Sequence, residues 1–188
     1  MKETKHLIAH ATANENREIY NGEYGDQCGF ELSASRWWDF KWNRVYRPVS
    51  DEHKEMIADF MEKAVSNGYI GYDTNMTKRD TLYNNLVEID FKVDQLNKLS
   101  LCDCSSLVYC AIYNVTRVPC DPVTESNELV SPRIRHFEDY INKLDGVFEI
   151  IEYPEFMDSD VDLMRGDIIV SLIDNGDGTF SGHTGVFV

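Results

Sequence analysis

The sequence predicts an α+β fold, in which helices come first along the chain and pack on an antiparallel sheet formed by later strands. Two observations predict this: apolar residues recur at helical spacing in three segments between residues 50 and 146, and β-rich runs dominate residues 147–188. The chain of 188 residues, 43% of them hydrophobic, has the length of one domain and contains no internal repeat or low-complexity linker. We therefore expect a single domain over residues 1–188, of which residues 1–50 form a polar, aromatic-rich N-terminal segment.

Three amphipathic helices are expected. The first begins after Ser50, an N-cap residue type that two acidic residues follow, and ends at Gly68. The second begins at or beside Cys104, because apolar residues recur from there with helical spacing, which puts this thiol at a helix N-terminus. Its apolar face consists of Cys104, Leu107, Val108, Ala111, Ile112 and Val115. The third starts at Ser131, with Pro132 as its first helical residue.

Three strands are expected in the C-terminal part, over residues 147–151, 167–173 and 179–188. The segment between the last two, Asp-Asn-Gly-Asp-Gly at residues 174–178, is typical of a hairpin turn. It lacks the alternating ligands and the distal glutamate of a calcium-binding loop, so we expect no calcium site there.

Charge and cysteine content exclude several classes of protein. The 18 basic and 33 acidic residues give 18 − 33 = −15, which would repel nucleic acid and anionic lipid. No apolar run is long enough to span a membrane, and the N-terminus lacks the apolar core of a signal peptide, so we expect a soluble chain made in the cytoplasm. Five cysteines without paired C-x-x-C motifs indicate free thiols rather than disulfides or a structural zinc site.

Three tryptophans fall within residues 37–42, next to a phenylalanine. Such a cluster is typical of core packing, but it also suits a platform for a sugar ring or a peptide. The sequence leaves both interpretations open.

Cys104 is the candidate nucleophile. A helix N-terminus favours the thiolate and a histidine partner favours it further, so we expect the pKa of this thiol below the free value of about 8.5. His183 is the candidate partner, because it opens a strand and has glycines close by that leave room beside the imidazole. His6 and His10 are expected in a mobile N-terminal segment. The alternative for Cys104 is a buried structural thiol.

Around these residues the sequence resembles a known family. Asp-Cys-Ser-Ser-Leu-Val at residues 103–108 resembles the D-C-S-[GS]-L-V signature of NlpC-type papain-like peptidoglycan hydrolases, which include bacteriophage amidohydrolases used as endolysins. Arg-Gly-Asp at 165–167 is similar to a strand opening of that family, and Gly-His-Thr-Gly-Val at 182–186 is similar to its histidine strand, in the same order. Weaker similarities are Gly-Asp-Gln at 25–27 and Gly-Tyr-Asp at 71–73.

The resemblance implies a papain-like fold with Cys104 as nucleophile and His183 as general base, later as acid toward the leaving amine. Backbone N–H groups at the start of the Cys104 helix would form much of the oxyanion hole. Asp103 is expected to cap this helix, and Ser105 to support the nucleophile beside it. Tyr72 is a candidate for a hydrogen bond to the oxyanion or the substrate, and alternatively a half-buried aromatic. No cofactor and no metal ion are implied.

The sequence departs from this family in one respect. The family has a third polar residue, usually His, Asn or Gln, on the strand after the histidine strand, where it holds the tautomer of the imidazole. The chain ends at Val188, so no matching position exists. Truncation, a substitute elsewhere in the chain and weak activity all remain open. An end within an apolar strand favours truncation, because it would leave a sheet edge unpaired.

The resemblance thus predicts a cysteine amidohydrolase that cleaves an amide bond in bacterial peptidoglycan, as a phage endolysin. It would be an N-acetylmuramoyl-L-alanine amidase or a stem-peptide endopeptidase, of which the Gly-His-Thr-Gly motif favours the amidase. It would be made in the host cytoplasm and act on the wall after release. Two alternatives remain: a non-catalytic wall-binding module of the same fold, and an intracellular cysteine peptidase or transferase. The oligomeric state is not predicted.

Overall fold

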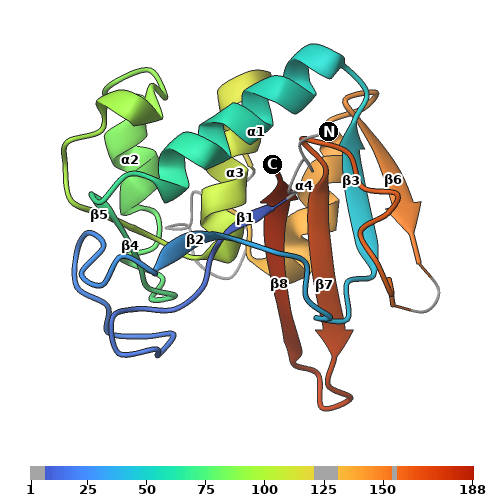
Figure 1. The fold of residues 1–188 in the computed structure, drawn as a ribbon, viewed down its shortest axis with the longest axis horizontal. Helices are drawn as coiled ribbons and strands as arrows, with labels where there is room; N and C mark the ends of the chain where they lie inside the picture. The colour runs from blue at the N-terminus through green and yellow to red at the C-terminus, as the bar shows by residue number, and fades with distance from the viewer. Residues whose placement is uncertain (1–6, 121–130, 154–155) are drawn as a thin grey trace, which may run out of the picture.

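The computed structural model describes residues 7–120, 131–153 and 156–188, and its fold is α+β, as the sequence predicts. Six strands form an antiparallel sheet in the order β2-β1-β8-β7-β3-β6 (Figure 1). They are β1 (Ile8–Ala11), β2 (Leu32–Ser35), β3 (Arg44–Pro48), β6 (Phe148–Glu152), β7 (Ile168–Asp174) and β8 (Phe180–Phe187). A smaller parallel sheet pairs β4 (Ile70–Tyr72) with β5 (Ser100–Cys102).

The helices confirm two of the three predicted segments. The α-helices are α1 (Asp51–Val65), α2 (Thr81–Val87), α3 (Cys104–Thr116) and α4 (Phe137–Lys143), and the short 3-10 helices are η1 (Val93–Gln95) and η2 (Ile134–His136). Ser50 caps α1 as predicted, with its hydroxyl accepting from the backbone N–H of His53. Both α1 and α3 begin where the apolar pattern places them.

The prediction that the third helix starts at Ser131 is wrong. Helical structure begins at η2, and the regular helix only at α4. The reason is tertiary: the Ser131 hydroxyl donates to the Asp80 carboxylate, and the Pro132 carbonyl accepts a hydrogen bond from buried Arg79 at 3.0 Å. These contacts hold Ser131 at the start of α2 and Pro132 on the arginine that also binds Asp103, rather than in a helical turn.

The C-terminal strands are confirmed, and the N-terminal ones are new. β7 and β8 form the predicted hairpin, closed by a turn in which Asp174 and Asp177 accept from backbone N–H groups two residues on. β8 lies between β7 and β1 in the interior of the sheet, so the argument that its end leaves an unpaired edge does not hold. The N-terminal segment supplies β1, β2 and β3, because residues far along the chain complete a sheet that its own pattern does not reveal.

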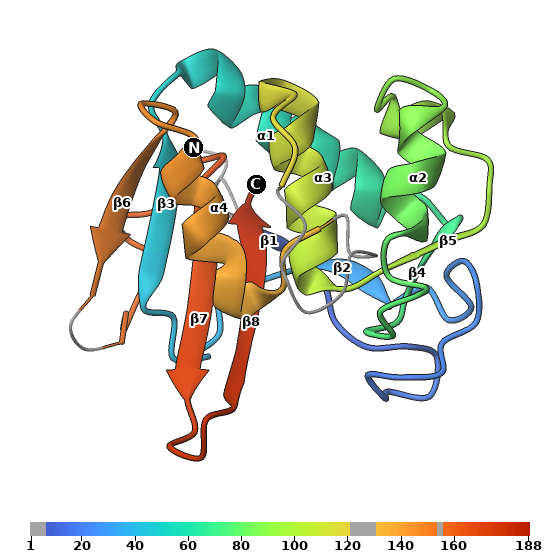
Figure 2. The same cartoon turned by 180° about the vertical axis from the view of Figure 1, so that it is seen from behind.

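The large sheet has two covered faces. Ala9, Val170 and Val186 face one side and pack with α1 and α3, and α4 belongs to the same cluster (Figure 2). Their strand neighbours Ile8, Ile169 and Phe187 face the other side and pack with Trp42. Trp42 is fully buried, which confirms core packing for this residue. Trp37 and Trp38 are half-buried and pack against the cluster that contains Trp42.

No helix in the described part of the chain combines the length and the apolar character that crossing a membrane requires.

Candidate active site

Cys104 is the first residue of α3, and the residue before it fixes the start of that helix. The Asp103 carboxylate accepts from the backbone N–H of Ser106 at 2.7 Å, and the Ser106 hydroxyl accepts from the backbone N–H of Asp103 at 2.8 Å. This reciprocal capping box satisfies two backbone donors and confirms the predicted capping role of Asp103.

A buried arginine binds the capping residue Asp103. Arg79 is fully buried, and its Nη2 donates to Asp103 Oδ1, Ser105 Oγ and the Pro132 carbonyl, each at 3.0 Å. Its Nε lies 2.9 Å from Asp103 Oδ2. Ser105 Oγ also donates to Asp103 Oδ1 at 3.0 Å. One cation therefore fixes the helix start and the segment before η2. Nothing in the local sequence around Arg79 indicates this role.

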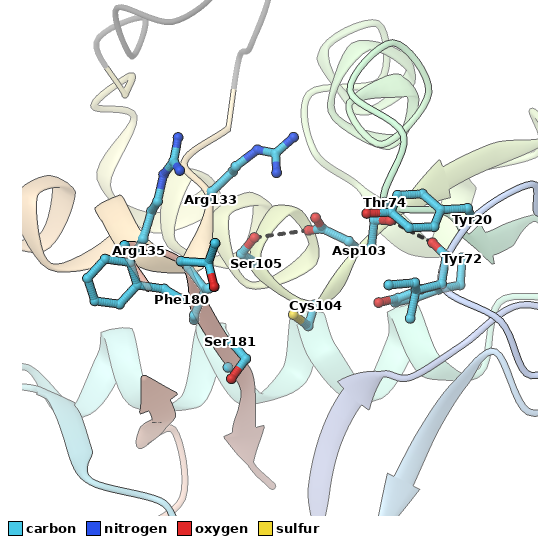
Figure 3. Close-up of a pocket in the computed structure, with 15 residues that line it drawn as sticks. Tyr20, Tyr72, Thr74, Asp103, Cys104, Ser105, Arg133, Arg135, Phe180 and Ser181 are labelled. Carbon is cyan, nitrogen blue, oxygen red and sulfur yellow. Dashed lines mark hydrogen bonds between the residues drawn. The ribbon is translucent and has the colours of Figure 1, made fainter. Parts of the chain in front are cut away.

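The Cys104 thiol lines an open pocket of about 400 Å³. Figure 3 shows the sulfur at the floor, with Tyr20, Tyr72 and Thr74 on one side and the segment from Arg133 to Arg135 on the other. The described lining residues are Ile19, Tyr20, Tyr72, Thr74, Asp103, Cys104, Ser105, Arg133, Ile134, Arg135, Gly178, Thr179, Phe180, Ser181 and Gly182. The structure thus brings together four of the five predicted site residues: Cys104, Asp103, Ser105 and Tyr72.

The thiol is held neutral at pH 7, contrary to the expected depressed pKa. The residue is 9% exposed, and burial, followed by the negative charge of Asp103, raises the pKa of Cys104 to about 12. Hydrogen bonds from the backbone N–H groups of Thr184 and Ser105 act in the opposite direction and lower this pKa. The helix N-terminus therefore does not lower the pKa of this thiol below its free value, because the effect of desolvation is larger.

The other cysteines keep the structural interpretation. All five are free thiols. Cys102 and Cys110 are fully buried, and burial raises the pKa of each well above its usual value.

The structure does not bring His183 to Cys104. On β8, Thr184 and Val186 face the helices, whereas His183 shares the opposite face with Gly185, whose missing Cβ would meet Ile8 and His10 there. The predicted alternation along this strand is right, but the face that packs on α3 is the other one. The His183 ring instead lies 5.4 to 6.2 Å from the rings of Trp38, Phe40 and Trp42.

His183 has a partner that sequence reasoning missed. His10 is on β1 and 4% exposed, so the expectation of a mobile N-terminal histidine is wrong for this residue. His10 Nδ1 lies 2.9 Å from His183 Nε2, and His10 Nε2 lies 3.1 Å from Ser35 Oγ. If Ser35 donates to His10, then His10 Nδ1 carries a proton and donates to His183, which fixes the tautomer of both rings. A residue elsewhere in the chain therefore orients this imidazole.

Both histidines are uncharged at neutral pH. Burial lowers the pKa of His10 to about 4, and burial together with repulsion from His10 lowers the pKa of His183 to about 3. The only signal for His10 in the sequence is a short apolar run, Leu-Ile-Ala-His-Ala, which is too brief to separate from a loop.

One group of residues in the described part of the chain has metal-ligand chemistry: Asp26, Cys28 and Glu31, whose ligand atoms lie within 4.8 Å of one another. Asp26 accepts from the backbone N–H groups of Cys28 and Gly29, and Glu31 accepts from those of Gln27 and Tyr72. These carboxylates are thus engaged in holding loops, and the group lies outside the residues that line the thiol pocket.

A family model for an endolysin-like domain matches residues 8–180, which is most of the chain and includes Cys104 but ends before His183. No curated protein and no solved structure matches. The match supports the endolysin part of the resemblance, and it does not extend to the NlpC-type, papain-like subtype. The chain therefore belongs to the endolysin-like domain family.

Proposed function

We propose that this chain is a phage peptidoglycan hydrolase that cleaves an amide bond of the bacterial cell wall with Cys104 as the nucleophile. The observation that carries the proposal is the position of the thiol: it lies at the first turn of a 13-residue helix, on the floor of an open pocket, with two backbone N–H groups close to the sulfur. Membership of the endolysin-like family supports the wall as substrate.

The chemistry follows from these groups. The Cys104 thiolate attacks the amide carbonyl, and the N–H groups of Ser105 and Thr184, which lower the pKa of the thiol, would donate to the oxygen that becomes negative. The C–N bond then breaks, the amine leaves with a proton, and water hydrolyses the thioester to regenerate the thiol. Because burial raises the pKa of Cys104 to about 12, the thiol reacts only if a neighbouring group accepts its proton. The same group then gives that proton to the leaving amine.

His183 as that acceptor is the part of the proposal that the geometry supports least, because the imidazole faces the other side of the sheet. Residues 180–184 pair with β7 alone, since the β1–β8 register covers only Val186 and Phe187 on β8. Backbone pairing therefore holds the segment that carries His183 on one edge, while the His10 side chain contacts it from the other. The catalytic pair would require His183 to leave His10 and turn to the face of α3.

The rate of Cys104 alkylation against pH tests the pair. If His183 accepts the proton, His183→Gln shifts the alkylation profile to higher pH, with Cys28→Ser as a control that leaves it unchanged. An identical profile in wild type and His183→Gln would exclude His183 as the base.

A non-catalytic wall-binding module is the second candidate, and the opposite placement of thiol and imidazole favours it. Purified walls distinguish the two. A hydrolase releases new free amines, and Cys104→Ala stops the release, whereas a binding module only sediments with the walls. Amine release that persists in Cys104→Ala would refute the proposed nucleophile.

A further inference from the structure

Arginine side chains line the thiol pocket of a strongly acidic protein. The chain has a net charge of −15, yet two arginines, Arg133 and Arg135, line the pocket. Asp103 is the only carboxylate among the described lining residues, and its charge is offset by buried Arg79. Arg133 therefore adds a positive charge that no carboxylate among the described lining residues offsets.

Arg133 differs from most other arginines of the chain. Arg44, Arg47, Arg117 and Arg165 each form an ion pair with a carboxylate. In the part of the chain that the structure describes, the Arg133 guanidinium has no ion pair and no hydrogen bond, although the residue is half-buried. Neighbouring Arg135 donates from Nε to His136 Nε2 at 2.9 Å.

Position and chemistry of this side chain fit a ligand. Arg133 lines the pocket from the segment before η2, and Figure 3 shows its guanidinium directed away from the Cys104 sulfur. A guanidinium presents a planar fork of donors that matches the two oxygens of a carboxylate, and it remains charged at all physiological pH values. A cation without an acidic partner among the described residues is therefore available for an anionic group of the substrate.

We propose that Arg133 binds a free carboxylate of the substrate in the thiol pocket. The substrate class is thus a wall peptide with an unamidated carboxylate rather than its carboxamide form. This inference rests on the proposed function, since it names the ligand of the same pocket. It also explains how a protein of charge −15 approaches an anionic polymer at this point of its surface.

Binding to a protein that cannot turn over gives the test. Two synthetic stem-peptide fragments of equal length, one with the free carboxylate and one with the carboxamide, are titrated into Cys104→Ala by calorimetry. We expect the carboxylate fragment to bind about ten- to a hundredfold more tightly, and Arg133→Gln to remove that difference while leaving the carboxamide fragment unaffected. Arg36→Gln, an exposed arginine outside the pocket, is the matched control and should keep the preference.

Every other outcome overturns the inference: equal binding of both fragments, no binding of either, or an equal loss for both in Arg133→Gln at an unchanged unfolding temperature. Turnover of the same fragments by the wild-type chain separates this inference from the proposed function. Preferential binding without hydrolysis would leave carboxylate recognition standing and refute the hydrolase, whereas hydrolysis without preference would do the reverse.

Discussion

The Cys104 pocket and the His10–His183 pair occupy opposite faces of the same strand, and they are built differently. At the pocket, buried Arg79 is paired with Asp103, Arg133 has no carboxylate partner among the described residues, and backbone N–H groups donate to the neutral thiol. At the histidine pair, aromatic rings exclude water and the imidazoles remain neutral. Thr184 serves the first site through its backbone and His183 the second through its side chain. Because successive side chains of a strand point to opposite faces, neighbouring residues of β8 contribute to two different sites.

The largest effect is expected from removing the sulfur. Cys104→Ser should reduce amine release from purified walls by more than about a thousandfold, because a hydroxyl without a base is a poor nucleophile. Cys28→Ser, outside the pocket, should retain wild-type release. Circular dichroism and an unchanged unfolding temperature would show that the loss is chemical. If the two variants behave alike, the pocket is not the catalytic region.

Removing the cation behind the pocket should cost stability. Arg79→Met leaves the buried Asp103 carboxylate without its partner, which should lower the free energy of unfolding by about 3–5 kcal/mol in urea titrations. Arg165→Gln breaks an exposed network with Glu55, Asp59 and Glu62 and should cost less than about 1 kcal/mol. A loss in Arg79→Met no greater than in Arg165→Gln would contradict the structural importance of the buried pair.

The histidine pair should make the free energy of unfolding depend on pH in the acidic range. Each imidazole has a folded-state pKa below its unfolded value of about 6.5, so the unfolded state binds more protons and stability falls as pH drops below that value. Between pH 7 and 5 the expected loss is about 2 kcal/mol per histidine. The double variant His10→Gln/His183→Gln should lack this part of the pH dependence. A slope equal to that of the wild type would show that the two rings titrate normally.

The smallest effect is expected at the end of the hydrogen-bond chain. Ser35→Ala removes a half-buried hydroxyl from His10 Nε2 and should lower the free energy of unfolding by about 0.5–1.5 kcal/mol. It should also change the tautomer ratio of His10, which nitrogen chemical shifts report. Ala34→Ser, which places a hydroxyl on the exposed neighbour, is the matched control. Unchanged shifts in Ser35→Ala would mean that this serine does not select the tautomer.

Local pattern was enough to predict α1, α3 and the β7–β8 hairpin, because each is specified by its own spacing of apolar residues and by a cap or turn within it. It also placed Cys104 at the start of α3 and Asp103 as its cap. Local pattern could not predict on which side of the sheet His183 lies. Alternation along a strand divides its residues between two faces, but it does not show which face packs on the helices.

The sequence also did not predict the residues that bind Asp103 at the pocket and His183 at the histidine pair. Arg79 meets Asp103 across 24 residues, and His10 meets His183 across 173. Such contacts depend on the assembled sheet and on burial, and a single arginine or histidine in a polar stretch carries no mark of them. The sequence of the short strand β1 does not distinguish it from a loop, because its strand structure depends on pairing with β2 and β8.

The pairing of β1 with β8 has a consequence for how the protein forms. Ile8 faces Phe187, so the first described strand finds this partner only when nearly all of the described chain has been synthesised. Contacts of such sequence separation carry a large loop-closure cost and slow the folding of a domain. On the ribosome, β1 and its histidine must wait with β2 as their only strand partner until β8 emerges. Among the described residues, the centre of the sheet therefore closes only after β8 has been synthesised, and the His10–His183 bond is one of their last long-range contacts to form.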